Sequence, residues 1–233
     1  MNDSANTMTS YCTIEQTHDL CFDLLTPEEA GFLENKMVVI TYRAGETICK
    51  QGSLANQIMI IREGLVKLYM ENGSDRLVLQ ILPPDNIIGL SSCSETNSIF
   101  FASAQAYRDT IVQVIDMNAF RQVLQSNPAF GNRMLQFLAE QNVITYGRFF
   151  CLTRKQTYGR LADVLLCLAN RIYKTKRFPL QLSRKELAEL SDMSVESIAR
   201  ILTSFKNEKL IELGSDYIEI LQLEKLDEIS RRG

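Results

Sequence analysis

Two short helices with clear start signals, joined by a tight turn, are predicted between residues 182 and 200. Ser183 begins the first helix, because its hydroxyl can accept a backbone hydrogen bond while Glu186, three residues later, reaches back to the cap. Ser194 begins the second helix after a three-residue turn. Apolar residues recur at helical spacing, so each helix has one face to bury. These residues are Leu187, Ala188 and Leu190 in the first helix and Ile198, Ile201, Leu202 and Phe205 in the second.

The opposite face of the second helix carries Val195, Glu196, Ala199 and Arg200. Two capped helices in this arrangement fit a helix-turn-helix motif, which places its second helix in the major groove of DNA. The alternative for Glu196 and Arg200 is a surface ion pair four residues apart, worth only about 0.2–0.5 kcal/mol. Their place on the second helix of the motif favours the DNA-reading interpretation.

Composition supports two domains in a cytoplasmic protein. The chain of 233 residues is long enough for two separate cores, and its apolar content of 45% is ordinary for a globular protein. No apolar run approaches the length of a membrane span, and the N-terminus lacks the pattern of a secretory signal. From Thr153 onward there are 15 Lys/Arg against 12 Asp/Glu, whereas the residues before it carry 10 against 16. A mildly basic C-terminal part suits a partner that carries phosphates.

The N-terminal half has the pattern of an antiparallel β-sandwich or barrel. Thr26, Pro27 and Glu29 form a helix start signal, and the chain then turns into short β-rich runs separated by glycine and proline. Asn72-Gly73 predicts a hairpin, because both residues tolerate positive φ. The predicted strands are Met37–Tyr42, Gln57–Arg62, Gly64–Met70, Arg76–Ile81, Ser103–Ala106 and Thr110–Asp116.

A long helix is predicted after Asn127-Pro128, running to about Phe150, with a short helix over Asn118–Leu124 before it. The apolar residues of the long helix cover more than one narrow stripe of its surface. One stripe follows the three-four spacing of paired helices, and we expect it to contact a second copy of the chain. The alternative is a helix packed only inside its own subunit. The predicted dimer stripe is Met134, Phe137, Gln141, Ile144 and Arg148.

The residues after this helix predict a small helical domain with a β-hairpin. An amphipathic helix is expected over Thr157–Lys174, and Phe178-Pro179 ends it. After the helix-turn-helix, Leu210–Ile220 alternates about a Gly-Ser-Asp turn, which predicts a β-hairpin, or wing. Leu221–Ile229 can add a terminal helix.

In this order the parts resemble the Crp/Fnr family of bacterial transcription regulators over nearly the whole chain. The glycine-punctuated segments Tyr42–Gly52 and Ile60–Tyr69 are similar to the β-roll of cyclic-nucleotide-binding domains, and Gly159–Leu166 is similar to the opening of the family's DNA-binding domain. The resemblance implies an α+β fold: an antiparallel, jelly-roll-like β-roll, a long dimerisation helix and a C-terminal winged helix-turn-helix. The expected boundaries are 1–25 for an N-terminal arm, 26–126 for the β-roll, 127–152 for the dimerisation helix and 153–233 for the DNA-binding domain.

The resemblance also implies roles on the second helix. Arg200 matches the family's guanine-reading arginine, and Glu196 matches a glutamate that accepts from a cytosine amino group. Val195 can touch a thymine methyl, and Ala199 stands where Fnr-type members have a serine. Phosphate contacts orient a protein without reading sequence. The candidates for them are Ser183, Arg184, Lys185, Ser194, Ser197 and Lys206.

The β-roll departs from the pattern of the family's cyclic-nucleotide binders. Those proteins have a glutamate after the cassette glycine and an arginine about ten residues later. Here the glycine of Ile88–Ser91 is kept without the glutamate, and Phe100–Ala104 holds no arginine. A buried phosphate without its cation is strongly disfavoured, so we expect this chain not to bind cyclic AMP. The candidate effector pocket is Gly89, Leu90, Phe101 and Ser103.

A four-cysteine iron–sulfur cluster of the Fnr type is not expected either. Only Cys12 and Cys21 lie near the start, and Gln113 occupies the position of the fourth cysteine. His18 lies between the two cysteines, but their spacing is poor for a metal site, and we assign no metal ligand. The signal is left open among haem, a gas, a redox change, a small metabolite and none.

The sequence therefore predicts a homodimeric transcription regulator that binds double-stranded DNA at a palindromic operator and acts with RNA polymerase. The alternative is a β-roll regulatory subunit of an enzyme without DNA binding; the helix-turn-helix and the wing argue against it. An enzyme is not expected, because the chain has no Gly-rich phosphate loop, no nucleophile–base pair and a single histidine.

Overall fold

The computed structural model describes residues 22–233 except 74, 95 and 181. These residues form two compact units, one ending at Thr145 and the other beginning at Tyr146. The boundary lies inside the long helix α3 (Pro128–Arg154), which contributes to both units. None of the helices in the described part of the chain is long and apolar enough to cross a bilayer.

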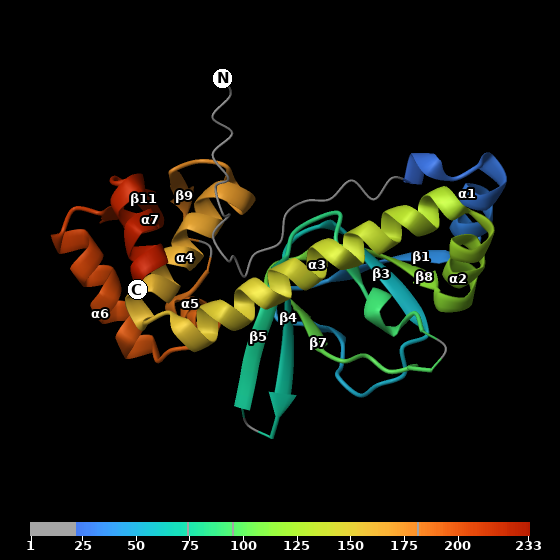
Figure 1. Cartoon of the computed structure of the whole chain (residues 1–233), viewed down its shortest axis with the longest axis horizontal. Coiled ribbons are helices and arrows are strands. Elements are labelled where there is room, and N and C mark those ends of the chain that lie inside the picture. The colour runs from blue at the N-terminus through green and yellow to red at the C-terminus, as the bar shows by residue number, and fades with distance from the viewer. Residues whose placement is uncertain (1–21, 74, 95, 181) are drawn as a thin grey trace. The chain divides into compact units, whose positions relative to one another are not determined.

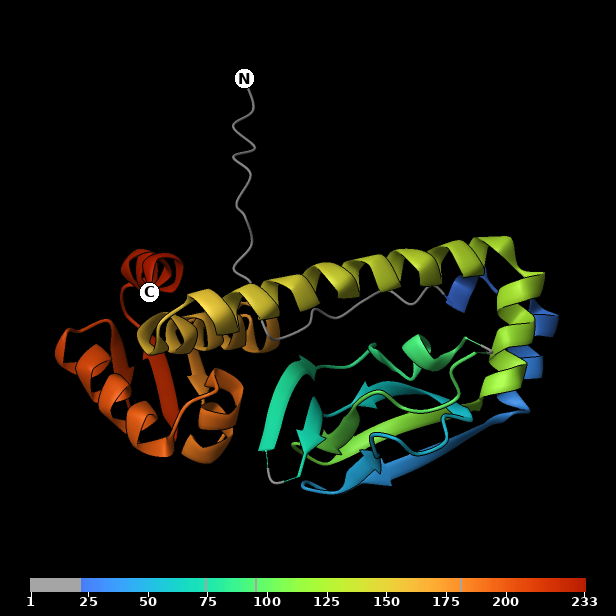
Figure 2. The same cartoon turned by 60° about the horizontal axis from the view of Figure 1, so that its bottom comes forward.

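The N-terminal unit is a jelly-roll of two antiparallel four-stranded sheets (Figures 1 and 2). The strand orders of the two sheets are β1-β8-β3-β6 and β2-β7-β4-β5. Successive strands lie in opposite sheets, except that β4 and β5 pair as a hairpin within one sheet, and this is the arrangement of a double Greek key. The predicted fold class is therefore confirmed. The strands are β1 (Met37–Tyr42), β2 (Thr47–Cys49), β3 (Gln57–Glu63), β4 (Val66–Asn72), β5 (Asp75–Leu82), β6 (Ile87–Ile88), β7 (Ser103–Ala106) and β8 (Thr110–Asp116).

Six of these strands follow the predicted runs within a few residues, whereas β2 and β6 are additional. Two of the glycines between the strands are required by the backbone conformation of the turns in which they lie. Gly64 has φ +99°, and a Cβ there would lie 2.4 Å from Thr110 Oγ1, so no larger residue fits between β3 and β4 without a shift. Gly73, with φ +63°, belongs to the turn that joins the paired strands β4 and β5, as Asn72-Gly73 predicted.

Short helices surround the roll. A 3₁₀ turn (Phe22–Leu24) precedes α1 (Pro27–Glu34), whose predicted capping box forms between Thr26 and Glu29. A second 3₁₀ turn (Leu90–Ser92) follows β6, and α2 (Met117–Ser126) follows β8 and leads into α3.

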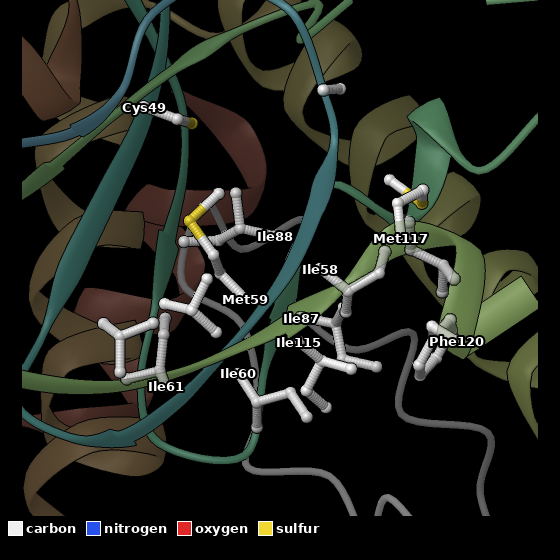
Figure 3. Close-up of a cluster of buried hydrophobic side chains, with 14 of the residues drawn as sticks. Cys49, Ile58, Met59, Ile60, Ile61, Ile87, Ile88, Ile115, Met117 and Phe120 are labelled. Carbon is white, nitrogen blue, oxygen red and sulfur yellow. The ribbon is translucent and has the colours of Figure 1, made fainter. Parts of the chain in front are cut away.

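The core of this unit fills the space between the sheets and reaches under the helices. β3 carries four consecutive buried apolar residues, because it lies inside its sheet between β8 and β6. Figure 3 shows Ile58, Ile87 and Ile115 gathered together, with Met117 and Phe120 of the neighbouring segment beside them. Phe130, Met134 and Phe137 of α3 extend the same core, so the first half of α3 is held by its own β-roll.

The C-terminal unit contains the predicted helix-turn-helix and wing. α5 (Arg184–Ser191) and α6 (Val195–Asn207) form the motif, and β10 (Ile211–Leu213) with β11 (Tyr217–Ile220) forms the hairpin. The sequence had predicted one helix over residues 157–174. The chain instead forms α4 (Thr157–Cys167) and then a π-helical segment (Leu168–Tyr173), and the residues around Pro179 form a short strand. That strand, β9 (Arg177–Pro179), pairs with β11, and α7 (Leu223–Arg232) ends the chain's described structure.

A buried polar network ties this unit together. Lys155 Nζ lies 2.6 Å from Asp163 Oδ2 of α4 and donates to Ser230 Oγ of α7 at 3.2 Å. Ser230 Oγ in turn donates to Asp163 Oδ1 at 2.6 Å. The two charged side chains are only 5% and 3% exposed. Each member is hydrogen-bonded to the other two, which a charge at this depth requires.

Candidate nucleic-acid interface

The two helices of the motif begin at serine caps, as predicted. Ser183 Oγ accepts from the N–H of Glu186 at 3.2 Å, and the Ser183 N–H donates to the Glu186 carboxylate at 2.7 Å. Ser194 Oγ accepts from the N–H of Ser197 at 3.1 Å. Asp192 ends α5 in the left-handed conformation, with φ +49°, and this reverses the chain within the turn. The caps fix where each helix starts and so fix which residues of α6 lie outside.

The four residues predicted to contact DNA bases differ in their solvent exposure. Val195, Glu196 and Arg200 are exposed on α6, and Ala199 is half-buried beside them. The buried side of α6 is the predicted apolar stripe of Ile198, Ile201, Leu202 and Phe205. Within the part of the chain that the structure describes, neither Glu196 nor Arg200 has an ion-pair partner, so the surface ion pair weighed from the sequence is not formed. A guanidinium and a carboxylate at the start of an exposed helix are thus free to meet the edges of bases.

The candidate phosphate contacts fall into two groups. Arg184, Lys185 and Lys206 are exposed cations near the ends of α5 and α6. Ser183 and Ser194 already use their oxygens as helix caps, and Ser194 Oγ also donates to Ser197 Oγ at 3.0 Å. The first N–H groups of a helix have no acceptor within the helix, and a helix start of this kind suits a phosphate oxygen.

Two further exposed side chains lie on α6 and on the strand that pairs with the wing, and the sequence did not predict them. Thr203 is exposed one turn beyond Arg200 and donates from Oγ1 to the carbonyl of Ala199 at 2.8 Å. Helical spacing from Glu196 and Arg200 could have identified it. Arg177 on β9 lies over the ring of Tyr217, 3.9 Å from its centroid, and 3.8 Å from Glu219. Phe178-Pro179 was interpreted from the sequence only as the end of a helix. That pattern does not indicate that Arg177 contacts the wing.

The exposed apolar side of α3 is not the side that the three-four spacing predicted for the dimer. Met134 and Phe137 lie in the β-roll core, Arg148 is buried in the C-terminal unit, and Gln141 and Ile144 are half-buried. At 100° per residue these five positions share one side of α3. The exposed apolar residues lie on the other side, and we call them the exposed α3 stripe: Leu135, Val143, Tyr146, Phe149 and Phe150. The three-four spacing therefore identified a packed face, but one that packs within its own chain.

A cavity of about 360 Å³ lies within the β-roll unit. Three of the four candidate effector residues, Gly89, Leu90 and Phe101, line it. Ser103 does not, because it is fully buried on β7 and its hydroxyl accepts from the N–H of Gln51 at 2.9 Å. Gly89 has φ +96°, and a Cβ there would lie 2.9 Å from the carbonyl oxygen of Gln57, so the chain at the cavity needs glycine.

Two of the free cysteines in the described range, Cys49 and Cys151, are buried. Burial raises the pKa of the Cys49 and Cys151 thiols to about 11, which keeps both protonated near neutral pH. Among the residues that the structure covers, no three His, Cys, Asp or Glu side chains gather as a metal site would require. Cys12, His18 and Cys21 lie outside the described residues.

Two protein families match this chain in the order of its two units. Residues 39–127 match the cyclic nucleotide-binding domain, and residues 159–229 match the Crp-like helix-turn-helix domain. Among curated proteins, the electron transport regulator A of Shewanella oneidensis is 26% identical over 78% of this chain and 74% of its own length. The cyclic AMP receptor protein of Thermus thermophilus is 25% identical over 90% of this chain and 95% of its own.

Solved structures share the fold. FixK2 from Bradyrhizobium japonicum superposes with a TM-score of 0.75 at 18% identity, covering 83% of this chain and 96% of that one. A mutant of CooA from Carboxydothermus hydrogenoformans gives a TM-score of 0.74 at 21% identity, covering 93% and 98%. Both structures therefore have the same fold as this chain.

Proposed function

Since the chain belongs to the Crp/Fnr family of DNA-binding transcription regulators, we propose that it acts as a homodimer that reads a palindromic operator with one α6 from each subunit. The observation that carries the proposal is the exposed start of α6. There Glu196 and Arg200 stand free of partners among the described residues on a helix whose start is fixed by Ser194. We assign the protein to the cytoplasm, in contact with RNA polymerase, and assign it no enzymatic activity.

Footprinting on fragments of the source genome tests this function. We expect the full chain to protect two half-sites whose centres lie about 34–36 Å, or one helical turn, apart, because each subunit of a symmetric dimer places one helix in the major groove. Protection of a single half-site, or uniform binding without a footprint, would contradict the proposal.

The dimer is assigned to the exposed α3 stripe. Val143 and Tyr146 are 68% and 70% exposed, and apolar surface of this kind on one side of a helix is suited to pairing with the same helix of a second copy. Leu135 and Phe149 extend the stripe fourteen residues apart, which is two heptads of a coiled-coil seam, with the polar Asn142 at the position between them.

Replacing Tyr146 with glutamate tests the stripe. A charge placed in a close helix pair is expected to weaken dimerisation by about 2 kcal/mol or more, which is at least thirtyfold. Light scattering after size-exclusion chromatography would show a dimer for the unchanged protein and a monomer for Tyr146→Glu at the same concentration. Gln125→Glu, on the exposed surface of α2, is the control and should remain dimeric. A dimer that survives Tyr146→Glu would place the interface elsewhere.

The signal is assigned to a molecule other than cyclic AMP. The cavity residues that the structure describes include no arginine and no other cation to neutralise a cyclic phosphate. We therefore expect calorimetric titration with cyclic AMP to give no saturable heat. Thermal unfolding should also be unchanged, whereas ligand at a hundred times its Kd would add about 2.7 kcal/mol of stability. Saturable binding of one cyclic AMP per subunit would refute this assignment.

A further inference from the structure

The cavity in the β-roll unit has the size and lining of a small-molecule site. Its volume of about 360 Å³ lies in the range of roughly 300–1,000 Å³ that such sites occupy. Most of its wall is apolar. The wall comes from strands β4, β5 and β6, from residues 89–92 and 100–102, and from α3, with Leu68, Leu82, Phe100 and Phe137 among the contributors. An apolar wall of this kind favours a ligand that is itself mainly apolar.

Two amides provide a polar point in this wall. Gln80 on β5 is only 5% exposed, and its Nε2 donates to Oε1 of Gln141 on α3 at 3.0 Å. The Nε2 of Gln141 is buried and has no hydrogen-bond partner among the residues described. An unsatisfied buried donor costs about 1–3 kcal/mol. Gln141 also lines the cavity, so a turn of its amide toward an entering ligand would let Nε2 donate to a ligand acceptor and recover that cost.

The cavity excludes charge. Among the described residues each side chain in its wall is neutral, including the remaining polar ones, Ser91, Ser92, Asn142 and Thr145. An ion buried there would lose its hydration without gaining a counter-ion, which is strongly unfavourable. The same argument that removes a cyclic phosphate therefore removes any carboxylate, sulfonate or ammonium from the deep part of the site.

We propose that this cavity binds an uncharged, mainly apolar organic molecule whose carbonyl or other acceptor atom receives a hydrogen bond from Gln141. The ligand would rest against Phe100 and would join β5 to α3 through the Gln80–Gln141 pair. The role of this site as a sensor rests on the proposed function. Ligand binding would act on the dimer through α3, because that helix also carries the exposed α3 stripe. Ligand binding itself, however, needs neither DNA nor a second subunit.

A neutral fluorescent ketone tests the proposal directly. Prodan, a planar aminonaphthalene that carries one carbonyl and no charge, shifts its emission to the blue when it leaves water. We expect saturable, blue-shifted binding of one Prodan per chain to the full protein. The anionic naphthalene dye 1-anilinonaphthalene-8-sulfonate, which has a similar ring system, should not compete for the site. Competition by the anion at equal affinity would overturn the exclusion of charge.

Two variants locate the bound dye. Gln141→Leu removes the donor while keeping the volume, and it should weaken Prodan about two- to twelvefold, since a net hydrogen bond is worth roughly 0.5–1.5 kcal/mol. Gln136→Leu makes the same change at an exposed position of α3 and should leave the affinity unchanged. Ala102→Phe fills the cavity and should abolish binding, with circular dichroism to confirm folding. Prodan binding that is equal in Gln141→Leu and Gln136→Leu would refute the site. A failed footprint with intact Prodan binding would instead refute the proposed function alone.

Discussion

Arg200→Ala is expected to remove the protein's preference for the guanine that we propose Arg200 contacts, while leaving its affinity for unrelated DNA nearly unchanged. The guanidinium is exposed on the first turns of α6 and has no ion-pair partner within the described residues, so its fork can face the O6 and N7 acceptors of a guanine. A bidentate contact of this kind is worth about 1–3 kcal/mol of discrimination. With one contact in each half-site the loss is about 2–6 kcal/mol, or roughly thirtyfold to ten-thousandfold in the ratio of affinities.

The measurement is a set of equilibrium binding constants. The operator recovered by footprinting is compared with versions in which single base pairs are changed symmetrically in both half-sites, at one fixed salt concentration. For the unchanged protein, one base-pair position should show a large penalty, and for Arg200→Ala the penalty at that position should vanish. Penalties at the other positions should persist, because Glu196 and Val195 still contact them.

Lys206→Ala is the matched control, since Lys206 is an exposed cation on the same helix but was assigned to a phosphate. It should weaken binding to every sequence by a similar factor and reduce the slope of affinity against salt by about one per subunit. If Arg200→Ala gave this uniform pattern instead, Arg200 would be a phosphate contact and the assignment of α6 as the reading helix would fail.

The motif behind this prediction could be identified from sequence because its signals are local. The serine caps, the turn and the apolar stripes of α5 and α6 each depend on residues within four positions of one another. The same holds for the long strands of the roll. β2 and β6, with three and two residues, are too short to show an alternating pattern, and they exist because neighbouring strands supply their partners.

The predicted positions of side chains were less accurate where tertiary packing decides them. Both sides of α3 carry apolar residues at three-four spacing, so sequence alone could not say that Met134 and Phe137 would enter the β-roll core and leave Tyr146 outside. Ser103 was assigned to the effector pocket from the position of its segment. Its hydroxyl instead accepts from Gln51, a partner more than fifty residues away in sequence.

The network of Lys155, Asp163 and Ser230 was not predicted from the sequence, because its three members come from separate segments of the chain. Lys155→Met will destabilise that unit by about 3–5 kcal/mol, because it leaves the Asp163 carboxylate buried without its counter-ion. The Ser230 hydroxyl remains as a donor at 2.6 Å, but one neutral hydrogen bond does not replace a buried charge partner. Methionine is chosen because it keeps the length and much of the volume of lysine.

Hydrogen exchange of the α4 and α7 amides is the appropriate measurement. The chain has two units, so a single unfolding transition of the whole protein would not report on this one alone. We expect exchange of the slowest α4 amides to accelerate by about 10²-fold or more in Lys155→Met, while amides of β3 in the other unit keep their rates. An equal acceleration in both units would show a global effect and contradict the prediction.

The double variant Lys155→Met/Asp163→Leu separates the cost of an orphaned charge from the value of the pair. Replacing both members of a buried ion pair with apolar residues of similar size is often neutral or stabilising, by about 1–4 kcal/mol. The double variant should therefore recover most of the protection that Lys155→Met loses. If it is as unstable as the single variant, the ion pair itself stabilises the unit, beyond the need to satisfy one buried carboxylate. If Lys155→Met alone loses less than about 1 kcal/mol, Asp163 is protonated or hydrated in that variant and the network does not hold α4 to α7 as we infer.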